Sequence, residues 1–316
     1  METKLIVIKN SNLEVAFSNL GASIYYIKYF DEFMTLTPEK IEDFEKANIY
    51  NGKTIGRVAN RIKGNLIHID GESYRIRNNE GKNTLHGGRE SLSTRYFSCL
   101  QTKDDEADII TFTYKSKDGE SGFPGTLDVT VRYTVENDSL RIEYFAKTND
   151  KNTLCNLTNH TYFTLGENSL DKLRLKLPSK EYVETTKEDL LPKCKRYSKY
   201  CINFDYFKNI TSRIDDEYLQ NHRSKGYDHY MFFLEENRND KINLHNSKYL
   251  LSIETDYEGA QIYSDNYEDN VECFNTDALT HRGIAIEPSK SILDLNQLNV
   301  GEEYRHFILY KFQKMN

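Results

Sequence analysis

An all-β protein, a large antiparallel β-sandwich with a few short helices, is the fold that the sequence predicts. Apolar runs of about four to eight residues recur between clusters of Asn, Asp and Gly, which is the spacing of strands and turns. Clean alternation of apolar and polar residues over 126–135 indicates a half-buried strand. No repeat, low-complexity tract or linker rich in Pro, Gly or Ser interrupts residues 1–316, so one domain is expected.

The first quarter of the chain is expected to contain five strands and one helix. Three strands near the N-terminus are expected at 5–8, 13–17 and 24–29. The helix is expected over 37–47, with Thr37 as its cap and Pro38 at its first position. Its apolar residues Ile41 and Phe44 fall on one face. Two further strands flank an Asp-Gly turn, at 66–70 and 74–77.

The middle of the chain contains the clearest hairpin. One face of its first strand is apolar, with Leu127, Val129, Val131, Tyr133 and Val135. The second strand repeats the pattern with Leu140, Ile142, Tyr144 and Ala146. The two strands therefore form an antiparallel hairpin with one wet face. A long ordered excursion is expected over 177–221, after which strands resume at 230–234, 249–255, 260–263, 283–286 and 304–312.

Composition argues against several classes of function. The net charge is −7, and phosphate binding needs a basic face, so no nucleic-acid partner is expected. The five cysteines form no C-x-x-C pair, which argues against a disulfide framework or a zinc knuckle. The N-terminus has no signal-peptide pattern, and no segment reaches the run of about eighteen apolar residues that spans a membrane. We expect a cytoplasmic protein, a monomer or a homodimer, without a membrane partner.

The first candidate for chemistry is His160, in the stretch Asn156–Leu165. Thr158, Asn159 and Thr161 can hold its imidazole by hydrogen bonds, and Tyr162 can wall a substrate pocket. A positioned proton carrier would be built in this way. The alternative is a histidine satisfied within the core at a strand end.

Two glycine-containing segments form a second group of candidates. The loop 56–64 can present Asn60 and Arg61 as a cluster of hydrogen-bond donors, although a solvated basic turn is the alternative. Further on, His86 precedes two glycines, as expected where the chain bends sharply near a ligand.

Three polar residues at expected strand ends form the third group. Asp228 lies at the start of one strand, Gln261 opens the stretch Gln-Ile-Tyr-Ser-Asp-Asn, and Glu287 ends an apolar strand just before Pro288, where that strand should stop. A carboxylate leaving a buried strand is desolvated, which raises its pKa and suits a general base. The alternative is that each acid is simply solvated.

Together these residues resemble the aldose 1-epimerases, also called galactose mutarotases. The resemblance runs in order from Gly56 to Glu287 and covers most of the chain. Its motifs are Asn60-Arg61, Leu85–Gly88, Gly122–Gly125, Asn156–Leu165 and Gly226–His229. Each motif alone is weak, but the ordered set is specific.

The resemblance implies a galactose mutarotase-like supersandwich with an open sugar cleft. It implies interconversion of the α and β anomers of hexoses such as galactose or glucose, without a metal or an organic cofactor. Glu287 would be the general base and His160 the general acid. The substrate-binding residues would be Asn60, Arg61, His86, Asp228 and Gln261, with Tyr162 beside them as a wall.

The side chains suit this chemistry independently of the resemblance. A base can remove the proton of the C1 hydroxyl while an acid protonates the ring oxygen, which opens the pyranose. Each transfer supplies about 10²–10⁴ in rate, so one carboxylate and one imidazole suffice. A bell-shaped pH profile is expected, with its acid limb from Glu287 and its alkaline limb from His160.

Two segments depart from the family pattern. Ser264-Asp265-Asn266 replaces a Thr-Gly-Asn, and the stretch Pro288–Asn296 lacks the usual Phe-Pro. The second change gives two alternatives: a looser rim over the sugar, with weak and unselective binding, or inward packing of Ile292 and Leu293 as core.

Two other functions compete with the epimerase. A glycosidase could use Asp228 and Glu287 as paired carboxylates. A sugar-binding module could keep the cleft and lose catalysis, although binding alone needs no matched acid and base.

Overall fold

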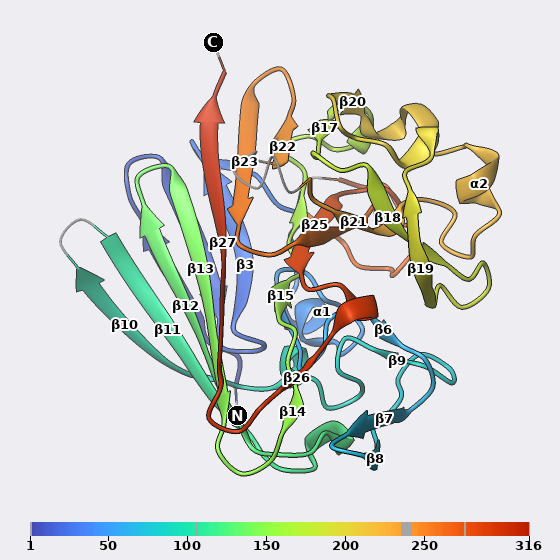
Figure 1. Ribbon diagram of the computed structural model, residues 1–316. Coiled ribbons are helices and arrows are strands. Elements are labelled where there is room, and N and C mark those ends of the chain that lie inside the picture. The colour runs from blue at the N-terminus through green and yellow to red at the C-terminus, as the bar shows by residue number, and fades with distance from the viewer. Residues whose placement is uncertain (1, 105–106, 235–241, 275, 316) are drawn as a thin grey trace.

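The computed structural model, in which residues 2–104, 107–234, 242–274 and 276–315 are described, is built around a nine-stranded antiparallel sheet (Figure 1). Its strands follow the order β10 (Ser98–Asp104), β11 (Ala107–Ser116), β12 (Leu127–Glu136), β13 (Ser139–Thr148), β27 (Glu303–Lys314), β23 (Tyr249–Thr255), β22 (Ile242–His245), β17 (Arg174–Lys176) and β20 (Lys208–Asn209). The C-terminal strand thus lies in the middle of the sheet, between the predicted hairpin and β23.

Two smaller antiparallel sheets pack against the nine-stranded one. The first has four strands, β1 (Leu5–Lys9), β2 (Leu13–Ser18), β3 (Ser23–Tyr29) and β4 (Glu32–Phe33). The second has six, in the order β16 (Tyr162–Phe163), β25 (Ile284–Ser289), β24 (Gly259–Tyr263), β21 (Asp228–Phe232), β18 (Glu181–Thr185) and β19 (Pro192–Tyr197). Phe17 of β2 meets Tyr133 of β12 with ring centroids 4.8 Å apart, and Phe163 of β16 meets Tyr310 of β27 at 5.0 Å. The predicted antiparallel sandwich is confirmed.

The central hairpin shows why the chain folds in this way. Along β12 every second residue is buried, from Leu127 to Val135, and β13 alternates in the same phase from Leu140 to Ala146. Full burial of each such side chain stabilises the fold by about 1.5–3 kcal/mol. A slip of one residue would expose the whole apolar set, so burial fixes the register of the pair.

Four two-stranded ladders bring the sequence motifs together. They are β5 (Thr54–Ile55) with β15 (Thr158–Asn159), β6 (Arg61–Ile62) with β9 (Thr84–Leu85), β7 (Leu66–Ile69) with β8 (Glu72–Arg75), and β14 (Thr153–Leu154) with β26 (Gln297–Leu298). The first ladder places the His160 stretch beside the loop 46–53. The second joins the Asn60-Arg61 loop to the His86 bend.

The expected excursion over 177–221 is ordered, and its strands belong to the six-stranded and the nine-stranded sheet. β18 and β19 extend the six-stranded sheet, and β20 pairs with β17 at the edge of the nine-stranded one. The excursion ends in the short helix α2 (Glu217–Gln220), at the right of Figure 1. The two α-helices among the described residues have five and four residues, and neither could cross a membrane.

The helix predicted over 37–47 is shorter than expected. It is α1 (Ile41–Glu45), and Lys40, not Thr37, occupies the cap position. Pro38 instead forms a β-bridge with Cys273, because the residues before it are extended and paired with other segments. The buried face was predicted correctly, since Phe44 is fully buried.

The expectation that Pro288 ends its strand is wrong. β25 continues to Ser289, and Pro288 pairs with Ala260 of β24. The neighbour on the other side, β16, covers only the first two residues of β25. Pro288 therefore lies where the strand has one partner, a position at which the missing N–H removes no ladder bond.

Candidate active site

A cleft of about 250 Å³ lies over one face of the six-stranded sheet. All eight residues that the sequence predicted for the site line it: Asn60, Arg61, His86, His160, Tyr162, Asp228, Gln261 and Glu287. They come from segments spread over more than two thirds of the chain, and the fold brings them to one place.

The floor of the cleft is built by adjacent strands of this sheet. Gln261 of β24 lies directly opposite Glu287 of β25, and Tyr263 lies opposite Ala285. On the other side of β24, Gln261 pairs with Tyr230, two residues after Asp228. Side chains two residues apart on a strand share a face, so Asp228, Gln261 and Glu287 all point into the cleft.

The opposite wall carries the two histidines. The main chain of His160, between β15 and β16, is held on both sides: its N–H donates to the Lys53 carbonyl at 3.0 Å, and its carbonyl accepts from the N–H of Gly52 at 2.9 Å. His86 precedes the predicted sharp bend, where Gly87 has φ +87°. A Cβ on Gly87 would lie 2.1 Å from the Gly56 carbonyl oxygen, so only glycine fits.

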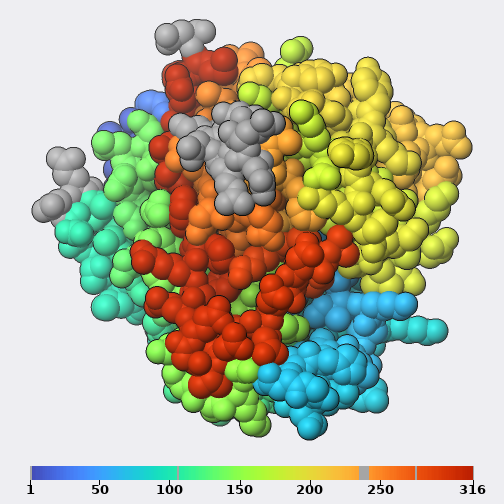
Figure 2. Space-filling view, in the orientation of Figure 1, coloured from blue at the N-terminus to red at the C-terminus, as the bar shows by residue number. Residues whose placement is uncertain are grey.

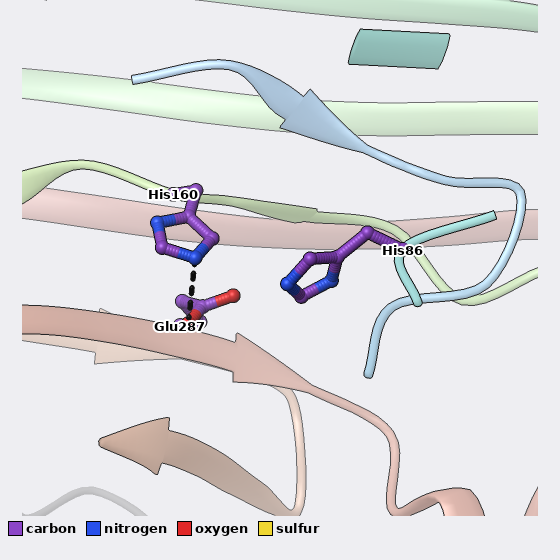
Figure 3. A group of neighbouring side chains, drawn as sticks. All are labelled: His86, His160 and Glu287. Carbon is purple, nitrogen blue, oxygen red and sulfur yellow. Dashed lines mark ion pairs between the residues drawn. The ribbon is translucent and has the colours of Figure 1, made fainter. Parts of the chain in front are cut away.

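His160 and Glu287 form a buried pair, shown in Figure 3. Nε2 of the imidazole lies 3.5 Å from Oε1 of the carboxyl, and the two side chains are only 5% and 3% exposed. Burial lowers the pKa of His160 to about 4. Burial also raises the pKa of Glu287 well above its ordinary value; Asp228 adds to this shift and Arg61 opposes it. A proton shared by the pair therefore rests on Glu287 before a sugar binds.

Hydrogen bonds join the other predicted residues into one network. Nη1 of Arg61 donates to Oδ2 of Asp228 at 3.1 Å, and Nε2 of Gln261 donates to Oδ1 of the same carboxylate at 2.6 Å. Nδ2 of Asn60 donates to Oε1 of Gln261 at 2.8 Å, and the Asn60 N–H donates to Nδ1 of His86 at 3.2 Å. Five residues predicted separately thus position one another.

The tautomer of His86 follows from this network. Burial, with His160 and Arg61 nearby, lowers its pKa well below the ordinary value, so the ring is neutral. Since Nδ1 accepts the N–H of Asn60, the ring proton lies on Nε2. The possible metal-ligand atoms of His86, His160 and Glu287 lie within 4.8 Å of one another, which is close enough for a metal site. Nδ1 of His86 already accepts a hydrogen bond and Nε2 carries the proton, so His86 has no free lone pair for a metal ion. The group fits hydrogen bonding to a ligand, in which His86 is a donor.

Several cleft residues were missed by sequence reasoning. The Tyr50 ring stacks on His160 at 5.6 Å and meets His86 edge-on at 4.9 Å, and Glu80 contacts Arg61. Tyr263 could have been predicted from the sequence, because it lies two positions after Gln261 on the same strand and its side chain therefore lies on the same face. No local pattern marks the rim residues Asn48, Tyr267, Glu268 and Asp269, and Asp265 was noted only as a departure from the family pattern.

The atypical residue Asp265 has a structural role at this rim. Its side chain is buried and accepts from Nε of Arg282 at 2.6 Å, while Nη2 of Arg282 donates to Asp269 at 2.8 Å. Its φ of +48° is one that Asp tolerates better than most residues. The departure from a glycine therefore ties the rim to Arg282.

The apolar residues Ile292, Leu293 and Leu295 of the segment Pro288–Asn296 are partly buried against two clusters beside the cleft. Ile292 and Leu295 lie against the cluster of Val58 and Ile67, and Leu293 lies against the cluster that contains Tyr230. Ile292 also lines a small pocket that shares Arg61, Asp228 and Gln261 with the cleft. In Figure 2 the red C-terminal surface borders both the light-blue surface from the first quarter of the chain and the yellow excursion. The segment therefore packs partly inward, as the second alternative expects, but Ile292 and Leu293 do not join the fully buried core.

The loop 56–64 is not a solvated turn, and its two arginines have different surroundings. Arg61 faces the cleft, whereas Arg57 is buried away from it. Nη1 of Arg57 donates to the carbonyls of Pro124 and Gly125 at 3.0 and 2.8 Å. The Gly122–Gly125 motif thus supplies two of the carbonyl groups that hold Arg57.

The chain as a whole is similar to known proteins of one family. The pattern of the family described as aldose 1-epimerase matches residues 4–311. An aldose 1-epimerase of Haemophilus influenzae is 32% identical over 277 residues, 84% of this chain and 79% of that protein. A galactose mutarotase of Rattus norvegicus is 30% identical over 289 residues, 86% of this chain and 82% of that protein. A solved galactose 1-epimerase from Lactobacillus acidophilus is similar with a TM-score of 0.90 at 23% identity, covering 100% of this chain and 96% of that one.

Proposed function

The chain belongs to the aldose 1-epimerase family, so it is an isomerase that interconverts the anomers of aldoses, and we propose that it acts on free hexoses such as galactose and glucose with Glu287 as general base and His160 as general acid. The observation that carries the proposal is the buried pair of these two side chains at 3.5 Å, inside a cleft lined by hydrogen-bonding groups.

The proposed reaction is a balanced exchange of two protons. Glu287 takes the proton of the C1 hydroxyl, and His160 gives a proton to the ring oxygen as the bond between C1 and that oxygen breaks. The open-chain aldehyde rotates about C1–C2. Attack by the C5 hydroxyl on the other face then closes the ring, while His160 recovers its proton and Glu287 returns one to the oxygen on C1. Each assisted transfer supplies about 10²–10⁴ in rate.

The electrostatics of the pair determine which of its two proton arrangements is the resting one and which must form before the ring opens. Opening begins with an ion pair, imidazolium and carboxylate, and ends with a neutral imidazole and a carboxylic acid. Burial disfavours both charges, as the lowered pKa of His160 and the raised pKa of Glu287 indicate. The attraction across 3.5 Å opposes this cost, so both proton arrangements are accessible within one pair.

The glycosidase alternative is less well supported by the contacts of Asp228. Its two oxygens already accept bonds from Arg61 and Gln261, which suits a residue that holds a sugar hydroxyl. The partner of Glu287 in the cleft is an imidazole. A binding module would gain nothing from a buried acid and base in contact.

Polarimetry tests the proposal directly. The optical rotation of freshly dissolved α-D-galactose or α-D-glucose should relax faster with the protein than without it. The Glu287→Gln protein is the matched control, since the amide has nearly the same volume and cannot take a proton. Release of reducing sugar from an aryl galactoside would support the glycosidase instead. Sugar binding by calorimetry without faster relaxation would support the binding module.

A further inference from the structure

Glu80, which the sequence did not single out, holds the cleft arginine by two bonds. It lies in the turn before β9 and lines the cleft. Nε of Arg61 donates to its Oε2 at 2.8 Å, and Nη2 donates to its Oε1 at 3.2 Å. This two-point contact fixes the plane of the guanidinium, which a single ion pair would leave free to rotate.

The contacts of Arg61 leave defined donors for a ligand. A guanidinium has five N–H groups. Glu80 takes two of them and Asp228 takes one, which leaves two, one on Nη1 and one on Nη2. Because Glu80 holds one edge and Asp228 another, both remaining N–H groups have fixed directions. The side chain of Arg61 is only 7% exposed, so these donors act in a dry site.

Arg223 extends the network to the mouth of the cleft. Its Nη2 lies 2.5 Å from Oε1 of Glu80, and its side chain also bonds Tyr267 of the rim. Arg61 alone would face two carboxylates, with one negative charge in excess; Arg223 balances it. Exposure rises along the chain of contacts, from 7% for Arg61 to 20% for Glu80 and 41% for Arg223.

We propose that Glu80 is a positioning residue for the sugar, which acts through Arg61, and that Arg223 supports it from the rim. The inference rests on the proposed function and adds that recognition is set by a three-residue relay that begins at the surface. Because the relay holds a group that contacts the sugar in both ground and transition states, it should control KM and leave kcat unchanged.

The first test is the KM of Glu80→Gln. We expect KM to rise about tenfold, because Arg61 loses one of its two charged partners, with kcat within about threefold of the parent. Glu72→Gln is the matched control, since Glu72 is an exposed glutamate on the neighbouring strand β8, and its KM should not change. A fall of kcat at constant KM, or an unchanged KM, would overturn the proposal.

A double-mutant cycle with Arg61→Ala separates positioning from direct contact. If Glu80 acts through Arg61, the double variant should have the KM of Arg61→Ala alone. If the two effects multiply, Glu80 contacts the sugar itself and the relay is wrong. A merely structural role would lower the unfolding temperature of Glu80→Gln and would show no coupling to Arg61 in KM.

Arg223→Gln is the second variant, because a surface residue can change without loss of folding. We expect its KM to rise about threefold at low salt, and the difference from the parent to shrink as salt screens the exposed pair. An unchanged KM at low salt would remove Arg223 from the relay. If the parent itself shows no mutarotation, the proposed function fails; an active parent with these KM values unaffected contradicts the relay alone.

Discussion

Arg57 and Arg61 lie four residues apart in one loop, and both are buried, yet their surroundings give them opposite uses. All three nitrogens of Arg57 donate to neutral acceptors, the carbonyls of Ser116, Lys117, Pro124 and Gly125 and the hydroxyls of Ser116 and Thr153. Arg61 contacts two carboxylates and keeps two N–H groups unused. Saturated donors stabilise the fold, and spare donors in a cleft bind ligands.

The pKa values of the two arginines differ for the same reason. Burial lowers the pKa of Arg57 to about 10, and the attraction of Glu120, the largest opposing effect, offsets only part of the shift. Burial also acts to lower the pKa of Arg61, but Asp228 and Glu80 overcome it and raise the pKa above the ordinary value. Burial of the Arg57 cation among uncharged acceptors costs free energy, and its seven hydrogen bonds offset this cost.

The largest effect is expected at His160 and Glu287, the proposed proton-transfer pair in the cleft. His160→Asn and Glu287→Gln should each lower kcat by about 10²–10⁴-fold, because each removes one proton transfer and little volume. Polarimetry gives kcat, and thermal unfolding should show both variants folded. Near-normal mutarotation by either variant contradicts the assignment of acid and base.

The same substitution at both arginines tests the comparison itself. Arg57→Lys should lower the free energy of unfolding by about 3 kcal/mol, since a lysine cannot reach all the acceptors and leaves buried carbonyls unpaired. Its KM should stay unchanged. Arg61→Lys should raise KM about tenfold to a hundredfold with a smaller loss of stability. Urea unfolding gives the stability of both variants, and polarimetry gives their KM. A raised KM in Arg57→Lys together with a larger loss of stability in Arg61→Lys would contradict the distinction between the two arginines.

The pH profile of activity tests the pair His160 and Glu287 separately from the two arginines, because Arg57 and Arg61 stay charged while that pair titrates. Activity needs one proton on the pair. With the pKa of His160 at about 4 and that of Glu287 raised, the acid limb belongs to His160, near pH 4, and the alkaline limb to Glu287. This reverses the assignment expected from the sequence, because burial disfavours the charged form of both groups. An acid limb near pH 6 or above would contradict it.

The smallest effect is expected at Lys53, a second buried cation outside the cleft lining. Its Nζ donates to the Lys46 carbonyl at 3.1 Å, and burial lowers its pKa to about 7, partly opposed by Glu45. Lys53→Met should therefore stabilise the protein by about 1–3 kcal/mol at pH 7 and below.

The sign follows from linkage. Between pH 7 and about 10.5 the unfolded chain holds a proton on Lys53 that the folded chain has lost, so the parent gains stability as pH rises through this window. The advantage of Lys53→Met should shrink accordingly. Lys46→Met, at a half-exposed lysine, is the control and should show no such trend. Destabilisation by Lys53→Met at every pH would contradict the argument.

The sequence alone determined the sandwich and the identity of eight cleft residues. Alternation from Leu127 to Ala146 was sufficient for the hairpin, because one buried face imposes a period of two on the residues themselves. The ordered motifs were sufficient for the family. Each of these signals is carried by residues that are near one another in the chain, or by their order along it.

Tertiary structure decided what each side chain contacts. Arg61 meets Asp228 across 167 positions, and Asn60 meets Gln261 across 201, so no local pattern separates the cleft arginine from Arg57. The role of Glu80, the late start of α1, and the passage of β25 through Pro288 likewise depend on neighbours supplied by other segments. Burial and hydrogen-bond partners are properties of the folded chain, and they set the charge states of His160 and Glu287.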